Sequence, residues 1–356
     1  MTRNDHRGSG TPGGRAGYAI DSCIGADSFP HGLSAAAGFD PLPFVHPELR
    51  PFMEPMRQLV GTIRLSNETL VTRRRVDFSQ PTSEAPPFVD RLIAGTAGSP
   101  AVRVYVINAG VAATAHRPAI LHMHGGGFVM LDARSSIHNL QDLAVALDCV
   151  IVTVDYRLAP ETRFPGALND NYAALLWLYK NADELGVDRM RIAVMGDSAG
   201  GGHAAMLAIA ARDRGEVPLI FQALIYPMLD DRTGSSRRAP PHVGMVVWSA
   251  EDNEFGWTSL LGVPAGSGSV PHGSVPARES ELSGLPPTFI GVGSIDLFAD
   301  ENVEYARRLM GAGVVTELHV VPGAFHGFDG LLMTTVAKQF RSILINALAR
   351  GLHPNR

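Results

Sequence analysis

The chain has 356 residues, of which 45% are hydrophobic and 18% are charged, so it can bury the core of one large α/β domain with an additional segment. Its net charge of −5 excludes the basic surface of a nucleic-acid-binding protein, and its two cysteines, far apart in the sequence, exclude a disulfide framework and a cysteine metal site. We therefore expect one folded unit that binds no nucleic acid and no metal, in a reducing cytoplasm.

The N-terminal region differs in composition from the rest of the chain. Residues 1–30 are rich in Gly, Ser and Pro and lack the apolar segment of a signal peptide, which predicts a disordered tail. Residues 31–71 contain short amphipathic pieces interrupted by prolines, which predicts short helices that pack onto a larger domain. No later apolar run is as long as a membrane span, so we expect no membrane-spanning helix.

Strands dominate the next stretch and then alternate with helices. A basic cluster at 73–75 precedes them, and we expect it to lie on a solvated strand edge. Apolar and β-branched runs predict strands at 75–78, 88–93, 102–107, 119–124, 150–156, 191–195, 221–226, 288–293 and 317–321. Helical periodicity predicts helices at 137–147, 167–185, 204–211, 303–310 and 331–348. This alternation predicts a mostly parallel sheet covered by helices on both faces.

The alternation is interrupted by residues 228–286, a connection far longer than an ordinary strand-to-helix loop. The segment is rich in Gly, Ser, Pro and His, but it contains aromatic islands at 245–248 and 255–261. A long insertion at the carboxyl edge of a sheet is either a lid or a surface loop, and the aromatic islands favour a lid. The α/β core is then formed by residues 72–227 and 287–356.

The segment 191–202 predicts a strand, a sharp turn and a helix of small residues, with Gly196-Asp-Ser-Ala-Gly200 at the turn. A serine at such a turn is held in a strained conformation that pushes its hydroxyl clear of the sheet. A Gly-x-Ser-x-Gly sequence alone also fits a plain Gly/Ser turn, but the buried strand before it and the helix after it favour a nucleophile turn. Ser198 is therefore the candidate nucleophile.

A serine nucleophile needs a base and an acid that orients the base, and both are found at the ends of later strands. Asp296 follows the strand at 288–293, and His326 follows the strand at 317–321, so both lie at the carboxyl edge. The other carboxylates and histidines that could compete for these roles are placed less well, in a helix turn, within a strand, on the helix behind the serine or in the insertion. These are Asp300, Glu301, Asp329, His203, His242, His272 and His319. Asp197 is adjacent to the serine, and we expect it to make a polar tie within the turn.

Three glycines follow the strand at 119–124 directly, in the run His122-Met-His-Gly-Gly-Gly-Phe128. Such a run exposes backbone N–H groups that can stabilise an oxyanion, and we assign Gly126 and Gly127 this role together with the N–H of Ala199. A phosphate-binding loop is the other glycine-rich possibility, but no Gly-Lys-Ser/Thr follows. His124 is expected to anchor the loop through a hydrogen bond.

Five motifs in the right order resemble the hormone-sensitive-lipase-like esterases, the bacterial family IV carboxylesterases of the Gly-Asp-Ser-Ala-Gly type. They are His124-Gly-Gly-Gly-Phe128, Asp155-Tyr-Arg-Leu-Ala-Pro-Glu161, Gly196-Asp-Ser-Ala-Gly-Gly201, Asp296-Leu-Phe-Ala-Asp-Glu301 and Phe325-His-Gly-Phe328. The resemblance extends from about residue 119 to the C-terminus. One departure is Leu297-Phe298, where the family usually has Pro-Leu after the acid.

The resemblance implies an α/β-hydrolase fold with a mostly parallel eight-stranded sheet and a mainly helical cap, formed by residues 31–71 and 228–286. It also implies a carboxylesterase for short- or medium-chain acyl esters, with no cofactor, Ser198, Asp296 and His326 as the triad, and Gly126, Gly127 and Ala199 as the oxyanion hole. We expect four aromatic side chains to line the substrate pocket, namely Phe128, Trp248, Phe255 and Trp257.

Two alternatives remain at this stage. An amidase, lactonase or acyltransferase could use the same site, since the core motifs do not separate these reactions. A non-catalytic ligand receptor on the same fold would not need the candidate triad, so the presence of all three residues argues against it. The expected partner is a small-molecule ester, and the sequence is compatible with a homodimer without deciding the oligomeric state.

Overall fold

A computed structural model describes residues 39–60, 63–76, 80–96, 98–110 and 116–353. The tail expected at 1–30 lies outside these residues, as does the start of the expected N-terminal helical segment at 31–38. Across the described part of the chain, no helix combines the length and the apolar character needed to cross a bilayer.

The described residues form one sheet of eight strands in the order β1-β2-β4-β3-β5-β6-β7-β8. The first two pairings, β1 with β2 and β2 with β4, are antiparallel, and the remaining ones are parallel. The expected mostly parallel sheet is therefore confirmed. The strands are β1 (Phe88–Ile93), β2 (Val102–Ile107), β3 (Arg117–Met123), β4 (Val150–Asp155), β5 (Val187–Asp197), β6 (Phe221–Ile225), β7 (Thr288–Gly293) and β8 (Thr316–Val321).

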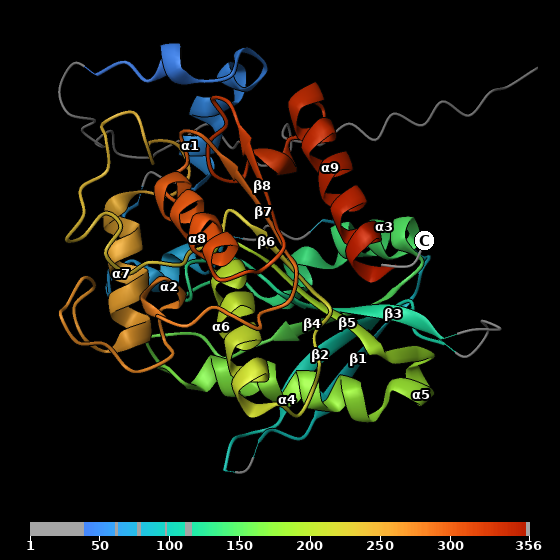
Figure 1. Cartoon of the computed structure of the whole chain (residues 1–356). Helices are drawn as coiled ribbons and strands as arrows, with labels where there is room; N and C mark the ends of the chain where they lie inside the picture. Colours follow the sequence, from blue (N-terminus) through green and yellow to red (C-terminus); the bar gives the residue numbers. More distant parts are fainter. Residues whose placement is uncertain (1–38, 61–62, 77–79, 97, 111–115, 354–356) are drawn as a thin grey trace, which may run out of the picture.

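Helices cover both faces of the sheet (Figure 1). On one face lie α3 (Ile137–Leu147) and α9 (Thr335–Leu352), and on the other lie α4 (Gly166–Lys180), α6 (Ala199–Arg214) and α8 (Ala299–Gly311). The remaining α-helices are α1 (Met53–Val60), α2 (Leu70–Arg73), α5 (Ala182–Leu185) and α7 (Ala250–Leu261), and the short 3-10 helices are η2 (Leu42–Phe44), η3 (Pro47–Phe52), η4 (Ala133–Ser136), η5 (Pro276–Arg278) and η6 (Phe328–Gly330).

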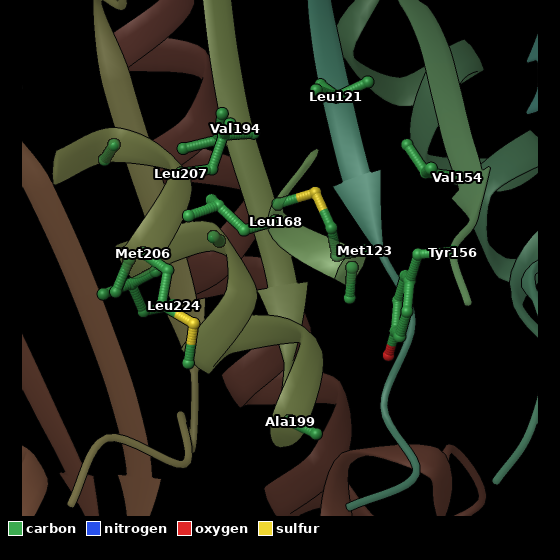
Figure 2. Packing of buried hydrophobic residues seen from close by; sticks show 14 of the residues in the cluster. Leu121, Met123, Val154, Tyr156, Leu168, Val194, Ala199, Met206, Leu207 and Leu224 are labelled. Carbon is green, nitrogen blue, oxygen red and sulfur yellow. The ribbon is translucent and has the colours of Figure 1, made fainter. Parts of the chain in front are cut away.

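Each face of the sheet has its own apolar core. The larger core lies under α4, α6 and α8, and Figure 2 shows part of it, with side chains that come from β3, β4, β5 and β6 and from helices α4 and α6. The second core lies between the sheet and the pair α3 and α9. Burial on both faces explains why the central strands are nearly continuous apolar runs, as parallel strands require.

Of the five expected helices, only that at 137–147 has the expected bounds. Helices α6 and α8 are longer at both ends than expected, and the other two differences have a local cause. The helix expected at 167–185 is divided into α4 and α5, because the Asn181 side chain donates to the Trp177 carbonyl at 2.8 Å and so competes with the helical backbone. The helix expected at 331–348 begins later, as α9, because the Thr334 hydroxyl accepts a hydrogen bond from the Ala337 N–H and caps the helix.

The expectation for residues 73–78 is wrong where the structure describes them. Residues 75 and 76 are not in a strand, and residues 77–79 lie outside the described part. Arg73 ends helix α2 and is buried, with its guanidinium donating to the Ile63 carbonyl. The next side chain, Arg74, donates to the Val129 carbonyl at 2.6 Å. Arg73 and Arg74 therefore bind backbone carbonyls, and the exposed Arg75 is not in a strand, so the cluster does not lie on a strand edge.

The N-terminal segment packs against the insertion, two regions that are far apart in the sequence. Arg57 donates to the Met245 carbonyl at 3.0 Å, and the Leu65 N–H donates to the Asp252 carboxylate at 2.8 Å. In Figure 1, α2 (blue) accordingly lies beside α7 (orange) at one side of the sheet. These contacts join residues 39–76 and 228–286 into one layer.

An ion pair fixes the start of α4 to the end of β4. Asp170 is buried, and its carboxylate accepts two side-chain hydrogen bonds at 2.7 and 2.8 Å and one backbone hydrogen bond at 3.0 Å from Arg157. Because Arg157 is partly exposed while Asp170 is not, removal of the arginine would leave the buried charge without its partner.

Arg157→Met is expected to lower the free energy of unfolding by about 3 kcal/mol, because it leaves the Asp170 carboxylate buried and uncompensated. Urea denaturation followed by circular dichroism measures this change. Arg189→Met is the matched control, since Arg189 pairs with Asp183 at the surface and its loss should cost less than about 1 kcal/mol. Equal effects of the two substitutions would contradict the prediction.

Candidate active site

Ser198 occupies the turn between β5 and α6 with a strained backbone, at φ 57° and ψ −122°. Hydrogen bonds on both sides hold the turn in place: the Ser198 N–H donates to the Ile225 carbonyl at 2.9 Å, and the Ser198 carbonyl accepts from the Met228 N–H at 2.9 Å. A Cβ on Gly200 would lie 2.1 Å from the Met123 carbonyl oxygen, so the turn packs directly against the end of β3. This packing accounts for the glycine after the serine.

The structure brings Ser198, His326 and Asp296 together in one hydrogen-bonded line. His326 Nε2 lies 2.9 Å from Ser198 Oγ, and His326 Nδ1 lies 2.8 Å from Asp296 Oδ2. The other carboxylate oxygen of Asp296 accepts from the Phe298 N–H at 2.9 Å. Asp296 is fully buried, and the serine and histidine are nearly so. Such a line can move a proton from a hydroxyl to an imidazole that a carboxylate orients.

The carboxylates that competed with Asp296 lie elsewhere. Asp300 is exposed in the first turn of α8, and Glu301 in the same turn is buried and accepts from the Leu229 N–H at 2.6 Å. Asp329 accepts from the Tyr226 hydroxyl at 2.7 Å. Of these four side chains, only that of Asp296 is hydrogen-bonded to His326.

Two aromatic rings enclose His326, and the sequence did not indicate either. Tyr226 follows β6 and meets the imidazole edge-on with ring centroids 4.6 Å apart, while Phe298 meets it at 5.3 Å. Burial raises the pKa of Tyr226 well above its usual value, so its hydroxyl stays protonated and donates to Asp329. Phe298 belongs to the Leu297-Phe298 departure, and it supplies both the N–H that holds Asp296 and a ring that holds His326.

The glycine run after β3 forms a loop at the same edge of the sheet. Gly126 and Gly127 have φ of +113° and +60°, and neither N–H donates to another group in the described part of the chain. Ala199 is the first residue of α6, so its N–H also has no helical partner. A Cβ on Gly127 would lie 2.1 Å from the ring of Trp248, which therefore packs directly on this loop.

Buried histidines lie next to the glycine run that follows β3. The rings of His124 and Tyr156 stack with centroids 4.2 Å apart, and the tyrosine hydroxyl donates to the His124 carbonyl at 2.6 Å. Burial lowers the pKa of His124 to about 4 and that of His203 to about 3, so both imidazoles are neutral at pH 7. His124 Nδ1 lies 2.8 Å from the Gly125 carbonyl, in agreement with the expected anchoring hydrogen bond.

The polar tie of Asp197 differs from the expectation. Its carboxylate lies 3.4 Å from His122 Nε2, on strand β3, and His122 Nδ1 lies 2.9 Å from the Thr153 hydroxyl on β4. The tie therefore joins the turn to two neighbouring strands and is not confined to the turn, because parallel strands bring their carboxyl ends to one edge.

The four aromatic residues expected in the pocket lie in different surroundings. Trp248 is nearly buried over Gly127, and its indole N–H donates to the Asn253 side chain at 3.2 Å. Trp257 is fully buried and meets the ring of Phe128 edge-on at 4.8 Å. Phe255 is half-buried against the larger core. Phe128 directly follows the glycine run, and the ring of Trp248 packs on Gly127 from the insertion.

The histidines of other segments lie away from the serine's hydrogen-bonded line. His242 stacks on Phe44 of the N-terminal segment with centroids 4.6 Å apart, and His319 lies within β8. His203 is buried on α6 beside Phe128 and Tyr156, and within the described part of the chain neither of its ring nitrogens has a hydrogen-bond partner.

Comparison with known proteins agrees with the α/β fold. A family model described as "alpha/beta hydrolase fold" matches residues 120–330. Among curated proteins, the chain is 37% identical to "Esterase LipI" of Mycobacterium tuberculosis, over 68% of this chain and 75% of that protein. It is 36% identical to "Carboxylesterase NlhH" of the same species, over 66% of this chain and 74% of that protein.

A solved structure gives the same result in three dimensions. "Bacterial Heroin Esterase" superposes with a TM-score of 0.75 at 33% sequence identity, and the match covers 88% of this chain and 99% of that one. The shared fold therefore extends over nearly the whole of the solved chain, beyond the residues that the family model matches.

His203→Leu is expected to stabilise the protein more at pH 5 than at pH 7.5. The folded pKa of about 3 is below the ordinary value of 6.5, so below pH 6.5 the unfolded chain binds a proton that the folded chain does not. At pH 5 this proton uptake lowers the free energy of unfolding of the wild type by about 2 kcal/mol, and it cannot occur at this position in the leucine variant. Urea denaturation at both pH values measures the difference, and an equal effect of the substitution at both would contradict the assignment of a neutral, buried imidazole.

Proposed function

This chain belongs to the hormone-sensitive-lipase-like family of α/β hydrolases and is a carboxylesterase-type hydrolase, and we propose that Ser198, His326 and Asp296 are its catalytic triad. The observation that supports the proposal is the hydrogen-bonded line of these three side chains at the carboxyl edge of the sheet, with separations of 2.9 and 2.8 Å. We further propose that the substrates are uncharged esters of short- to medium-chain acids.

Acylation follows from the geometry of the line. Ser198 Oγ forms a bond to the ester carbonyl carbon while its proton passes to His326 Nε2, and the carbonyl oxygen becomes an oxyanion. The bond from carbon to the alcohol oxygen then breaks, and His326 returns the proton to the departing alcohol. Asp296 accepts from Nδ1–H throughout, which holds the tautomer and stabilises the imidazolium. Water attacks the acyl-enzyme in the same way and releases the acid.

Three backbone N–H groups are suited to the oxyanion. Those of Gly126 and Gly127 have no partner among the described residues, and that of Ala199 begins α6, where the helix dipole favours negative charge. Donors that are fixed before the reaction need no reorganisation when charge develops, so each is expected to stabilise the transition state by about 3 kcal/mol.

The cap in this proposal consists of residues 31–71 and 228–286, over a core of residues 72–227 and 287–356. Its support is the set of contacts between the two segments and the position of Trp248 on the glycine loop. Trp248 is held in place through Asn253, which in turn donates to the Thr233 carbonyl at 2.7 Å. Trp248 is then the wall that limits the acyl chain, with Phe128, Phe255 and Trp257 as its supporting aromatic layer.

Amidase, lactonase and acyltransferase reactions would use the same three residues. Rates on p-nitrophenyl esters of graded chain length, measured beside matched anilides and lactones, separate these activities. The proposal requires the ester rates to exceed the amide rates, because an amine is the poorer leaving group at a site with no additional acid.

Ser198→Ala is expected to lower kcat on p-nitrophenyl butyrate by about 10⁴-fold or more, with an unchanged melting temperature, because alanine fits the turn but cannot form the acyl-enzyme. His326→Ala should be about as damaging, since the residues act as a unit. Asp300→Asn is the control, because this carboxylate is exposed in the helix that follows Asp296, and it should leave kcat within about twofold. Substantial turnover by the alanine variant of Ser198 would refute the assignment.

Trp248→Ala is expected to move the preferred acyl chain to longer esters. Each additional methylene that the enlarged pocket buries adds about 0.8 kcal/mol, or roughly fourfold in kcat/KM, until the chain meets the next wall. Phe255→Ala removes a half-buried ring of the same segment that packs against the larger core, so it is a control for general loosening. The measurement is kcat/KM along a series from acetate to decanoate. The same chain-length profile in wild type and in Trp248→Ala would show that this ring does not limit the substrate.

A further inference from the structure

Glu301 is a buried carboxyl group in the first turn of α8, only five residues after Asp296. Its side chain is 2% exposed, although the sequence position suggests an ordinary surface carboxylate that favours the helix dipole. A carboxyl group that is removed from water needs compensating contacts or a change of protonation state, so its surroundings require an explanation.

The contacts of Glu301 and its neighbour are all with the segment that follows β6. Glu301 Oε1 accepts from the N–H groups of Leu229 and Asp230 at 2.6 and 3.3 Å. Asn302, the next residue, donates through its side chain to the Pro227 carbonyl at 2.7 Å. The first turn of α8 therefore binds three consecutive peptide groups of residues 227–230.

Residues 227–230 in turn support the nucleophile turn. The Met228 N–H donates to the Ser198 carbonyl at 2.9 Å. The Met228 carbonyl packs so closely on α6 that a Cβ on Gly202 would lie 2.3 Å from it. Since α8 also begins directly after the loop of Asp296, Glu301 connects the backbone behind the nucleophile to the element that positions the acid.

We propose that Glu301 is a positioning residue, whose uncharged carboxyl group fastens residues 227–230 to α8 and so keeps the Ser198 turn in register with Asp296. The proposal rests on the proposed roles of Ser198 and Asp296 in ester hydrolysis. It assigns no contact with substrate to Glu301, which acts through the backbone alone.

The surroundings favour the uncharged form. Glu301 Oε2 has no hydrogen-bond partner among the described residues. Glu301 is also one of the residues that line a cavity of about 410 Å³. Burial is the main cause that raises the pKa of Glu301 to about 8, and the charge of Asp296 acts in the same direction, while the Thr233 side chain, the Leu229 N–H and the charge of Arg237 oppose the shift. The other titratable side chains around this cavity are Asp230, Arg232, Glu304, Tyr305 and Arg308. Asp230 already pairs with Arg232 and Arg237, so these arginines are partly neutralised.

Stability should therefore depend on pH in a defined direction. The folded pKa of about 8 lies above the usual value of 4.5, so between these values the folded chain keeps a proton that the unfolded chain releases. Rising pH then favours unfolding, and the stabilisation that protonated Glu301 contributes is lost above about pH 8. The low pKa values of His124 and His203 affect stability only below about pH 6.5, so the range from 6.5 to 8 isolates Glu301 from them.

The test compares Glu301→Gln, which keeps the acceptor without a charge, with Glu301→Ala, which removes it. Asp300→Asn is the matched control, because it removes an exposed carboxylate from the same helix turn. At pH 7 we expect kcat on p-nitrophenyl butyrate to stay within about threefold in the glutamine variant and to fall about tenfold or more in the alanine variant, with KM within about twofold in both.

The second readout is the melting temperature between pH 6.5 and 8. The wild type and Asp300→Asn should lose about 2 °C relative to Glu301→Gln over this range. The melting temperatures of the wild type, Asp300→Asn and Glu301→Gln test the proposal even if Glu301→Ala does not fold. A wild-type kcat in Glu301→Ala, or the same pH dependence in Glu301→Gln and wild type, would overturn the proposal. The melting temperature does not depend on the identity of the nucleophile, so failure of the triad assignment in the Ser198→Ala experiment is a separate result.

Discussion

The site depends on one strained residue, Ser198, whose φ of 57° and ψ of −122° lie outside the backbone regions that residues other than glycine prefer. Strain of this kind costs of the order of 1–3 kcal/mol and persists only where the surroundings hold it. Here the surroundings are β6, which accepts from the Ser198 N–H through Ile225, and the segment after β6, which donates to the Ser198 carbonyl through Met228. The position of the Ser198 hydroxyl is thus a consequence of hydrogen bonds made by the backbones of neighbouring segments.

Supports of the same kind hold the other parts of the site. Asp296 is fixed by the Phe298 N–H, and His326 is enclosed by the rings of Tyr226 and Phe298. The glycine loop rests on neutral, buried His124 and on Tyr156. Each of these groups lies just after the carboxyl end of a different or neighbouring strand. Because the carboxyl ends of parallel strands meet at the same edge, the sheet brings these groups together. Fixed dipoles and rings in a dry environment favour catalysis because nothing needs to reorient during the reaction.

The layer over the site is continuous with the apolar core. Leu65 and Leu70 of the N-terminal segment belong to the larger cluster under the sheet, as do Trp248 and Trp257 of the insertion. Polar contacts also join the two segments, such as those of Arg57 with the Met245 carbonyl and of the Leu65 N–H with Asp252. Apolar burial and hydrogen bonds between segments far apart in the sequence therefore hold the layer together.

Apolar runs in the sequence predicted the alternation of strands and helices and the bounds of β1, β2, β7 and α3, because these depend on local periodicity. The sequence also predicted that Ser198, His326 and Asp296 lie together, because a parallel sheet brings the carboxyl ends of its strands to one edge. The tertiary structure alone decided the rest. Glu301 and Arg73 look like solvated charges in sequence, yet both are buried, because their partners are backbone groups of distant segments. Likewise, only packing placed Trp248 on Gly127 while Trp257 became buried. Contacts between residues far apart in the chain follow from the way whole elements pack, and no local pattern records them.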